Sequence, residues 1–170
     1  QKIIDDYYRF SLYAEGAGKN EVTILWGSMY GMTAKAVDYA EKILQREGVK
    51  YNKLHMPLNS ESEAVATVFQ SAGIIIGAPT YEYKLFPPVA AALSELGRKR
   101  ITGKTAFRFG SYGWSGGAEK ELKEIVERNN MKWDFVESVE FEGAPKEEHF
   151  AKVEAGVMEL LKKMREKVVE

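Results

Sequence analysis

The chain has 170 residues, enough for one domain, and a domain of this size buries roughly 70% of the surface of its unfolded chain. Its 24 Lys and Arg against 25 Asp and Glu leave a net charge of −1, which excludes the strongly basic surface of a nucleic-acid-binding protein. It has no cysteine, which excludes disulfides, thiolate zinc sites and cysteine-ligated iron–sulfur clusters, so redox chemistry would require a bound cofactor.

The sequence gives us no reason to expect a membrane span or a signal peptide. No apolar run reaches the ~18 residues of a membrane span, and no signal peptide leads the chain. We therefore expect a cytoplasmic protein with neither a membrane nor a nucleic acid as partner. Because the first residue is Gln1 and not Met, we expect the chain to be processed or cut from something longer.

The first twenty residues differ in character from the rest. Ile3–Tyr13 is aromatic and helix-like, and Ala14–Asn20 reads as a linker because it contains two glycines and several polar residues. We therefore divide the chain into a connector segment, residues 1–20, and one domain, residues 21–170.

From residue 21 onward, short β-rich runs alternate with segments whose apolar residues recur at helical spacing. The expected strands are Val22–Trp26, Val49–Met56, Gly73–Gly77, Thr105–Phe109 and Trp133–Phe141; the expected helices are Gly31–Glu47, Glu61–Ser71, Phe86–Gly97, Gly117–Asn129 and a last one with its apolar face between Phe150 and Val168. The Gly73–Gly77 run is apolar on both faces, as in a central parallel strand covered on both sides. The alternation predicts an α/β fold, a doubly wound five-stranded parallel sheet with helices on both faces.

The unusual residues follow the first, third and fourth expected strands, whose carboxyl ends meet at one edge of such a sheet. The first loop, Trp26–Thr33, runs straight into a helix and carries hydroxyls but no Lys or Arg. Backbone N–H groups at a helix N-terminus favour an anion, so this loop is a candidate phosphate site. It also fits an ordinary turn with a serine cap.

The second and third loops, Gly77–Phe86 and Gly110–Gly117, are rich in aromatic residues. Stacking on a flat conjugated ring accounts for aromatics in exposed loops, although such residues also cap a core or face a partner. Two aromatic loops beside an anion loop favour a planar, phosphorylated ligand.

These three loops resemble those of a known family. Ser28-Met-Tyr-Gly-Met-Thr33 is similar to the flavodoxin phosphate loop, while Thr80-Tyr81 and Gly110-Ser-Tyr-Gly-Trp114 are similar to the loops that enclose the flavin ring. The likeness is greater to the flavodoxin-like domain of the flavodiiron proteins. It implies the strand order 2-1-3-4-5 and one noncovalent FMN, held by Ser28, Met29, Tyr30, Gly31, Met32, Thr33, Pro79, Thr80, Tyr81, Glu82, Tyr83, Ser111, Tyr112, Gly113, Trp114, Ser115 and Gly116.

The resemblance further implies electron transfer through FMN, as the electron-feeding domain of an oxygen or nitric oxide reductase. The implied partners are a redox protein such as rubredoxin, or a reductase, as donor and a diiron domain as acceptor. The diiron ligands themselves are missing, because the chain has only His55 and His149 and no H-x-E-x-D-H motif. Ile3–Ser11 also resembles the connector that follows the diiron domain.

Three alternatives stay open. The chain fits a stand-alone flavodoxin, and it fits a flavin reductase that uses NAD(P)H directly. Gly113–Gly117 also matches G-x-S-x-G, so Ser115 with His149 is a remote serine-hydrolase candidate, although we expect His149 to be a solvated surface residue. A basic cluster follows the third expected helix and would suit an acidic redox partner. It consists of Arg98, Lys99, Arg100 and Lys104.

Overall fold

The computed structural model describes residues 1–169 and alternates strands with helices, as expected. The helices are α1 Lys2–Ala14, α2 Met32–Arg46, α3 Glu61–Gln70, α4 Pro87–Arg98, α5 Ala118–Arg128 and α6 Glu147–Arg165. The strands are β1 Lys19–Trp26, β2 Lys50–His55, β3 Ser71–Gly77, β4 Thr80–Tyr81, β5 Lys84–Leu85, β6 Thr105–Tyr112, β7 Asp134–Phe135 and β8 Val139–Glu142.

The main sheet is parallel, with the order β2-β1-β3-β6-β7 and with β8 also paired to β6. This confirms the expected order 2-1-3-4-5. The fifth expected strand, Trp133–Phe141, is split in two. Ala106 pairs with Phe135 and Phe109 pairs with Val139. The neighbouring strand therefore advances by four residues where β6 advances by three. One extra residue bulges out of this edge strand and interrupts the pairing.

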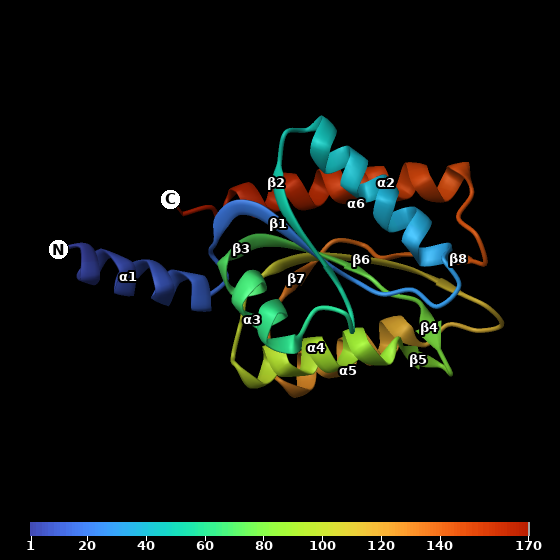
Figure 1. The fold of residues 1–170 in the computed structure, drawn as a ribbon, viewed down its shortest axis with the longest axis horizontal. Coiled ribbons are helices and arrows are strands. Elements are labelled where there is room, and N and C mark those ends of the chain that lie inside the picture. Colours follow the sequence, from blue (N-terminus) through green and yellow to red (C-terminus); the bar gives the residue numbers. More distant parts are fainter. Residues whose placement is uncertain (170) are drawn as a thin grey trace.

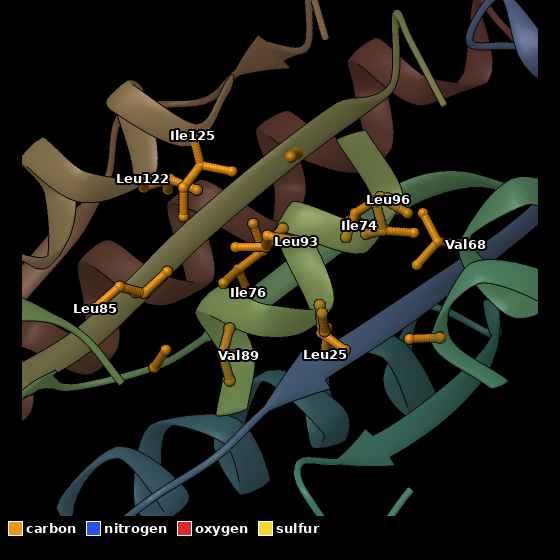
Figure 2. Close-up of a cluster of buried hydrophobic side chains, with 14 of the residues drawn as sticks. Leu25, Val68, Ile74, Ile76, Leu85, Val89, Leu93, Leu96, Leu122 and Ile125 are labelled. Carbon is orange, nitrogen blue, oxygen red and sulfur yellow. The ribbon is translucent and has the colours of Figure 1, made fainter. Parts of the chain in front are cut away.

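Helices cover both faces of the sheet (Figure 1). Alternate residues of β3 point to opposite sides, so Ile75 packs with α2 and α6 while Ile74 and Ile76 pack with α3, α4 and α5. Figure 2 shows Ile74 and Ile76 against Leu93 and Leu96 of α4. The apolar run of β3 is buried throughout, as the sequence predicts for a central strand.

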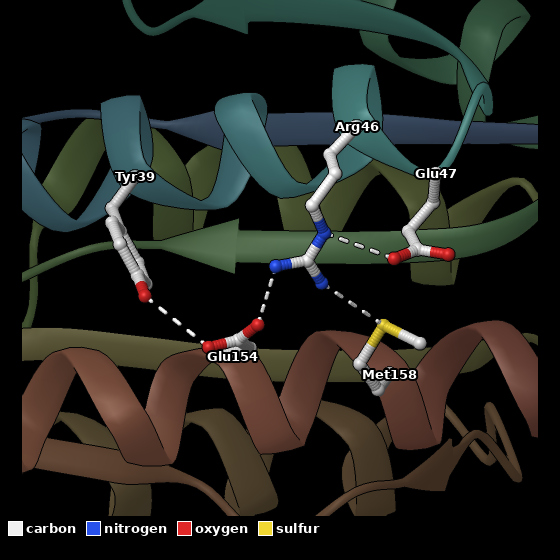
Figure 3. A network of polar contacts seen from close by, with 5 residues as sticks. All are labelled: Tyr39, Arg46, Glu47, Glu154 and Met158. Carbon is white, nitrogen blue, oxygen red and sulfur yellow. Dashed lines mark hydrogen bonds and ion pairs between the residues drawn. The ribbon is translucent and has the colours of Figure 1, made fainter.

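A polar network joins α2 to α6 on the surface of the molecule (Figure 3). The Arg46 guanidinium donates to the Glu154 carboxylate at 2.5 Å, and the Tyr39 hydroxyl donates to the other carboxylate oxygen at 3.4 Å. The hydrogen bond from Arg46 lowers the pKa of Glu154. The network fixes α2 against α6, and α2 begins directly after the first candidate loop.

Segment α1 lies apart from the sheet. In Figure 1 it extends away at the end opposite β4, β5 and β8. Tyr13 is buried against Phe69, whereas Ile3, Ile4, Tyr7 and Tyr8 are at least 65% exposed. β1 begins at Lys19, so the last two residues of the expected linker belong to a strand.

Candidate functional site

A cleft of about 530 Å³ lies at the carboxyl edge of the sheet, within the usual range for small-molecule sites. Its lining comes from the segments after β1, after β3, at the end of β6 and after β8: Met29, Tyr30, Met32, Pro79, Thr80, Tyr81, Glu82, Tyr83, Ser111, Tyr112, Gly113, Trp114, Ser115 and Gly143. Thirteen of the seventeen residues singled out in the sequence are therefore brought together. A second cleft of about 600 Å³, between the β7–β8 segment and α6, contains none of them.

The sequence reasoning missed one lining residue, Gly143. It follows β8, the second half of the fifth expected strand. The rule that ligands gather at the carboxyl ends of the strands applies to this strand as well, so the turn after it carried the signal.

The first loop ends in an uncapped helix. Gly31 precedes α2 with φ +81°, a left-handed conformation that favours glycine, and no side chain caps the first N–H groups of the helix. The Ser28 hydroxyl accepts a hydrogen bond from the Gly31 N–H at 3.0 Å, which closes the turn. Within the described residues the cleft lining has no Lys or Arg, and Glu82 is its one charged residue. Any anion here would be held by N–H dipoles.

Four of the singled-out residues do not line the cleft: Ser28, Gly31, Thr33 and Gly116. Thr33 is fully buried and turned toward the third loop. Its hydroxyl oxygen lies 3.1 Å from the Ser111 hydroxyl and accepts from the Ser111 N–H at 3.1 Å. Thr33 thus connects two walls of the cleft.

The second loop folds into a small hairpin, β4–β5, that the sequence did not reveal. Its two central residues, Glu82 and Tyr83, have φ of +46° and +65°. A two-residue hairpin of this form requires positive φ at both positions and normally uses Asn-Gly, so both residues are strained. The hairpin is held from outside, because the Glu121 carboxylate accepts from the Leu85 N–H and the backbone of Gly117 packs against the Tyr83 carbonyl.

The third loop begins later than expected, because β6 continues to Tyr112. Beyond it, Trp114 is fully exposed, and Tyr83 on the opposite hairpin is 75% exposed. A Cβ built on Gly113 has no neighbour within 4 Å, so there is open space beside the indole. Two exposed aromatic rings at the mouth of a cleft can enclose a flat conjugated ligand.

The hydrolase alternative lacks support, because no hydrogen bond joins Ser115 to His149 in the described residues. Ser115 lies three residues beyond the end of β6, whereas a nucleophile elbow turns at once from strand to helix. The Nδ1 of His149 accepts from the Lys146 N–H at 2.9 Å, and its side chain is only 16% exposed. The expectation of a solvated His149 was wrong, because this side chain caps the start of α6 and packs near Phe141.

The basic cluster is also smaller than expected. Arg98, Lys99 and Arg100 are exposed, but Lys104 is fully buried. Its ammonium donates to the carbonyls of Ala17, Phe69 and Ser71 at 2.7, 2.8 and 3.0 Å. Since α4 starts beside the cleft and runs away from it, the exposed cations at its far end lie remote from the site.

Two further searches concern the described part of the chain, residues 1–169. No group of three or more His, Cys, Asp or Glu is arranged to hold a metal ion. No helix in that range is both long and apolar enough to cross a membrane.

Comparison with known proteins gives nitric oxide reductases among the homologues. The chain is 28% identical over 123 residues to a nitric oxide reductase of Moorella thermoacetica, which covers 72% of this chain and 30% of the relative. It is 32% identical over 119 residues to an anaerobic nitric oxide reductase flavorubredoxin of Vibrio vulnificus, covering 69% and 24%. The chain thus spans about a third or less of these relatives. No family model matches it.

Solved structures agree on the fold. The rubredoxin:oxygen oxidoreductase of Desulfovibrio gigas matches 91% of this chain with a TM-score of 0.82 at 24% identity, over 38% of its own length. The flavodiiron protein of Giardia intestinalis matches 96% with a TM-score of 0.78 at 24% identity, over 40% of its length. A flavodoxin from the Archaea matches 85% with a TM-score of 0.71 at 19% identity, over 99% of its length. The resemblance to the flavodoxin-like domain of flavodiiron proteins is confirmed.

Proposed function

We propose that this chain, a flavodoxin-like domain whose homologues are flavodiiron proteins and nitric oxide reductase flavorubredoxins, binds one FMN and passes electrons through it. The observation that carries the proposal is the fully exposed Trp114 at the mouth of a cleft that also reaches the loop before α2. An aromatic platform at one end and free N–H groups at the other suit a flat ring joined to a phosphate.

The phosphate end fits FMN. A Cβ built on Gly31 meets nothing within 4 Å, which leaves room beside the first turn of α2. The uncapped N–H groups of that turn would donate to phosphate oxygens, and the helix dipole would favour their negative charge. Ser28 would hold the turn in shape through its hydrogen bond from Gly31.

The ring end fits as well. Trp114 would cover one face of the isoalloxazine ring, while Tyr81 and Tyr83 would lie on the hairpin side of the cleft. FMN, when bound, supplies the one- and two-electron redox chemistry that no side chain of this chain offers. The side chains position the ring, and their polar and charged groups set how readily it accepts electrons.

The proposal extends to the context of the domain. We assign the chain to the electron-feeding part of an oxygen or nitric oxide reductase, with rubredoxin or a reductase as donor and a diiron domain as acceptor, in the cytoplasm. Residues 1–20 would be the connector and residues 21–170 the FMN-binding domain. The exposed aromatic and aliphatic residues of α1 support this assignment, because such a face suits contact with further protein.

Oxygen consumption tests this function. The FMN-loaded chain is reduced without air, mixed with oxygen, and assayed for oxygen uptake and peroxide with and without a flavodiiron diiron domain. We expect slow uptake with peroxide from the chain alone, and faster uptake yielding water when the diiron domain is present. Rapid four-electron reduction of oxygen by the isolated chain would contradict the assignment. Rapid bleaching by NADPH or NADH alone would favour the flavin-reductase alternative.

A further inference from the structure

Arg108 is a fully buried cation in the middle of β6. Its neighbours along the strand, Phe107 and Phe109, belong to the core below the other face of the sheet. A charge this far from water is tolerated only when paired, because burial removes its hydration. Burial lowers the pKa of Arg108, and the carboxylates Glu140 and Glu119 oppose that shift.

Three groups surround the guanidinium. One terminal nitrogen donates to the Ala78 carbonyl at 2.7 Å. The other lies 3.5 Å from a carboxylate oxygen of Glu119 and 3.5 Å from one of Glu140. Neither carboxylate oxygen has a hydrogen-bond partner, nor do Nε and that second nitrogen of Arg108, so these two contacts are chiefly electrostatic. The cluster holds one positive and two negative charges.

Each member of the cluster lies within a few residues of one that lines the cleft, and Glu140 also lines the second cleft. Ala78 directly precedes Pro79, Glu119 lies in the first turn of α5 just after the third loop, and Glu140 lies on β8 before Gly143. Two glycines next in sequence to lining residues, Gly110 before Ser111 and Gly116 after Ser115, pack close to the cluster. A Cβ built on Gly110 would lie 2.8 Å from the Arg108 guanidinium, and one on Gly116 would lie 3.6 Å from the Glu140 carboxylate.

We propose that the buried Arg108 and the partly buried Glu119 and Glu140 form a charge cluster behind the cofactor cleft that positions its second and third loops and lowers the reduction potential of the bound cofactor. The inference rests on the proposed function, because it concerns FMN in that cleft. Reduction adds negative charge to the cleft, and two carboxylates balanced by a single guanidinium disfavour it. Arg108 is in this sense a positioning residue and does not itself touch the ring.

The test compares the FMN midpoint potential and the dissociation constant of oxidised FMN among isosteric variants. Glu119→Gln and Glu140→Gln each remove one negative charge and should raise the potential. At the effective dielectric constant near 20 that holds in proteins, loss of one such charge should raise the affinity for reduced FMN roughly tenfold relative to the affinity for oxidised FMN. Glu124→Gln, the same change at an exposed position of α5, is the matched control and should leave the potential unchanged.

Arg108 is tested by two further variants. Arg108→Lys keeps the charge and should keep the potential near that of the original chain, whereas Arg108→Met leaves the carboxylates uncompensated and should lower it. If Arg108→Met fails to fold, the two Glu→Gln variants decide the matter. Potentials equal to the Glu124→Gln control in both variants would overturn the inference. A chain that binds no FMN at all would instead refute the proposed function.

Discussion

The hydroxyl of Thr33 at the start of α2 accepts a hydrogen bond from the backbone of Ser111 at the end of β6. Thr33 is the last residue of the first loop and Ser111 lies on β6 just before the third, so this contact joins the candidate phosphate end of the cleft to its ring end. Because Thr33 is fully buried, its hydroxyl depends on such contacts within the protein.

Thr33→Val should therefore lower both the stability of the fold and the affinity of the cleft for FMN. Valine has the same shape but leaves the partly buried Ser111 N–H without its acceptor, at a cost of about 1 kcal/mol in the free energy of unfolding. Thr33→Ser keeps the hydroxyl and should lower the free energy of unfolding much less. Urea denaturation and FMN titration measure the two effects, and equal stability of the two variants would show that the bond contributes nothing.

Substitution of Gly31 separates phosphate recognition from the rest of FMN binding. Gly31→Asp places a carboxylate beside the first turn of α2, where it would repel the phosphate. The affinity for FMN should therefore fall far more than the affinity for riboflavin. Because Gly31 has φ +81°, any side chain here is strained, and Gly31→Asn is the matched control for strain without charge. Fluorescence titration with both ligands gives the comparison. If Gly31→Asp lowered the affinities for FMN and riboflavin equally, this loop would not be the phosphate site.

Trp114 should matter for the ligand and not for the fold. Its indole is fully exposed, so Trp114→Ala should leave the midpoint of thermal unfolding of the FMN-free chain unchanged. FMN should bind more weakly by about 1 kcal/mol or more, and flavin fluorescence should rise because the indole no longer quenches it. Trp114→Phe keeps an aromatic ring and should lower the affinity for FMN less. Unchanged affinity and fluorescence in Trp114→Ala would mean that the ring does not touch the flavin.

The sequence predicted most of this arrangement because its signals are local. The apolar run of β3, the helical spacing of α2 and the three loops at one edge each follow from neighbouring residues. The hairpin β4–β5 escaped because Glu82-Tyr83 lacks the Asn-Gly pattern that marks such turns. Its shape depends on the Glu121 carboxylate and the Gly117 backbone, which lie more than thirty residues away.

Buried charges were equally invisible in the sequence. The sequence places Lys104 in a basic cluster that would suit an acidic redox partner, because three cations precede it within six residues. Its actual partners are carbonyls of Ala17, Phe69 and Ser71, segments that only the tertiary fold brings together. The pairing of Arg108 with Glu119 and Glu140 has the same origin.

Lys104 gives a pH dependence with a definite sign. Burial, with a smaller effect of nearby Lys167, lowers the pKa of Lys104 from 10.5 to about 7. Between these two values the unfolded chain holds a proton that the folded chain has released, so the free energy of unfolding should rise with pH from about 7 toward 10. Lys104→Met should flatten this rise in denaturation curves measured across that range. Parallel curves for the two proteins would show that Lys104 titrates normally.

The visible absorption of the purified chain tests the central claim most directly. The chain is incubated with excess FMN, desalted, and its spectrum recorded before and after addition of a chemical reductant. We expect two flavin bands at a ratio of one FMN per chain, bleached on reduction and restored by air. A desalted protein without flavin absorption would contradict the account.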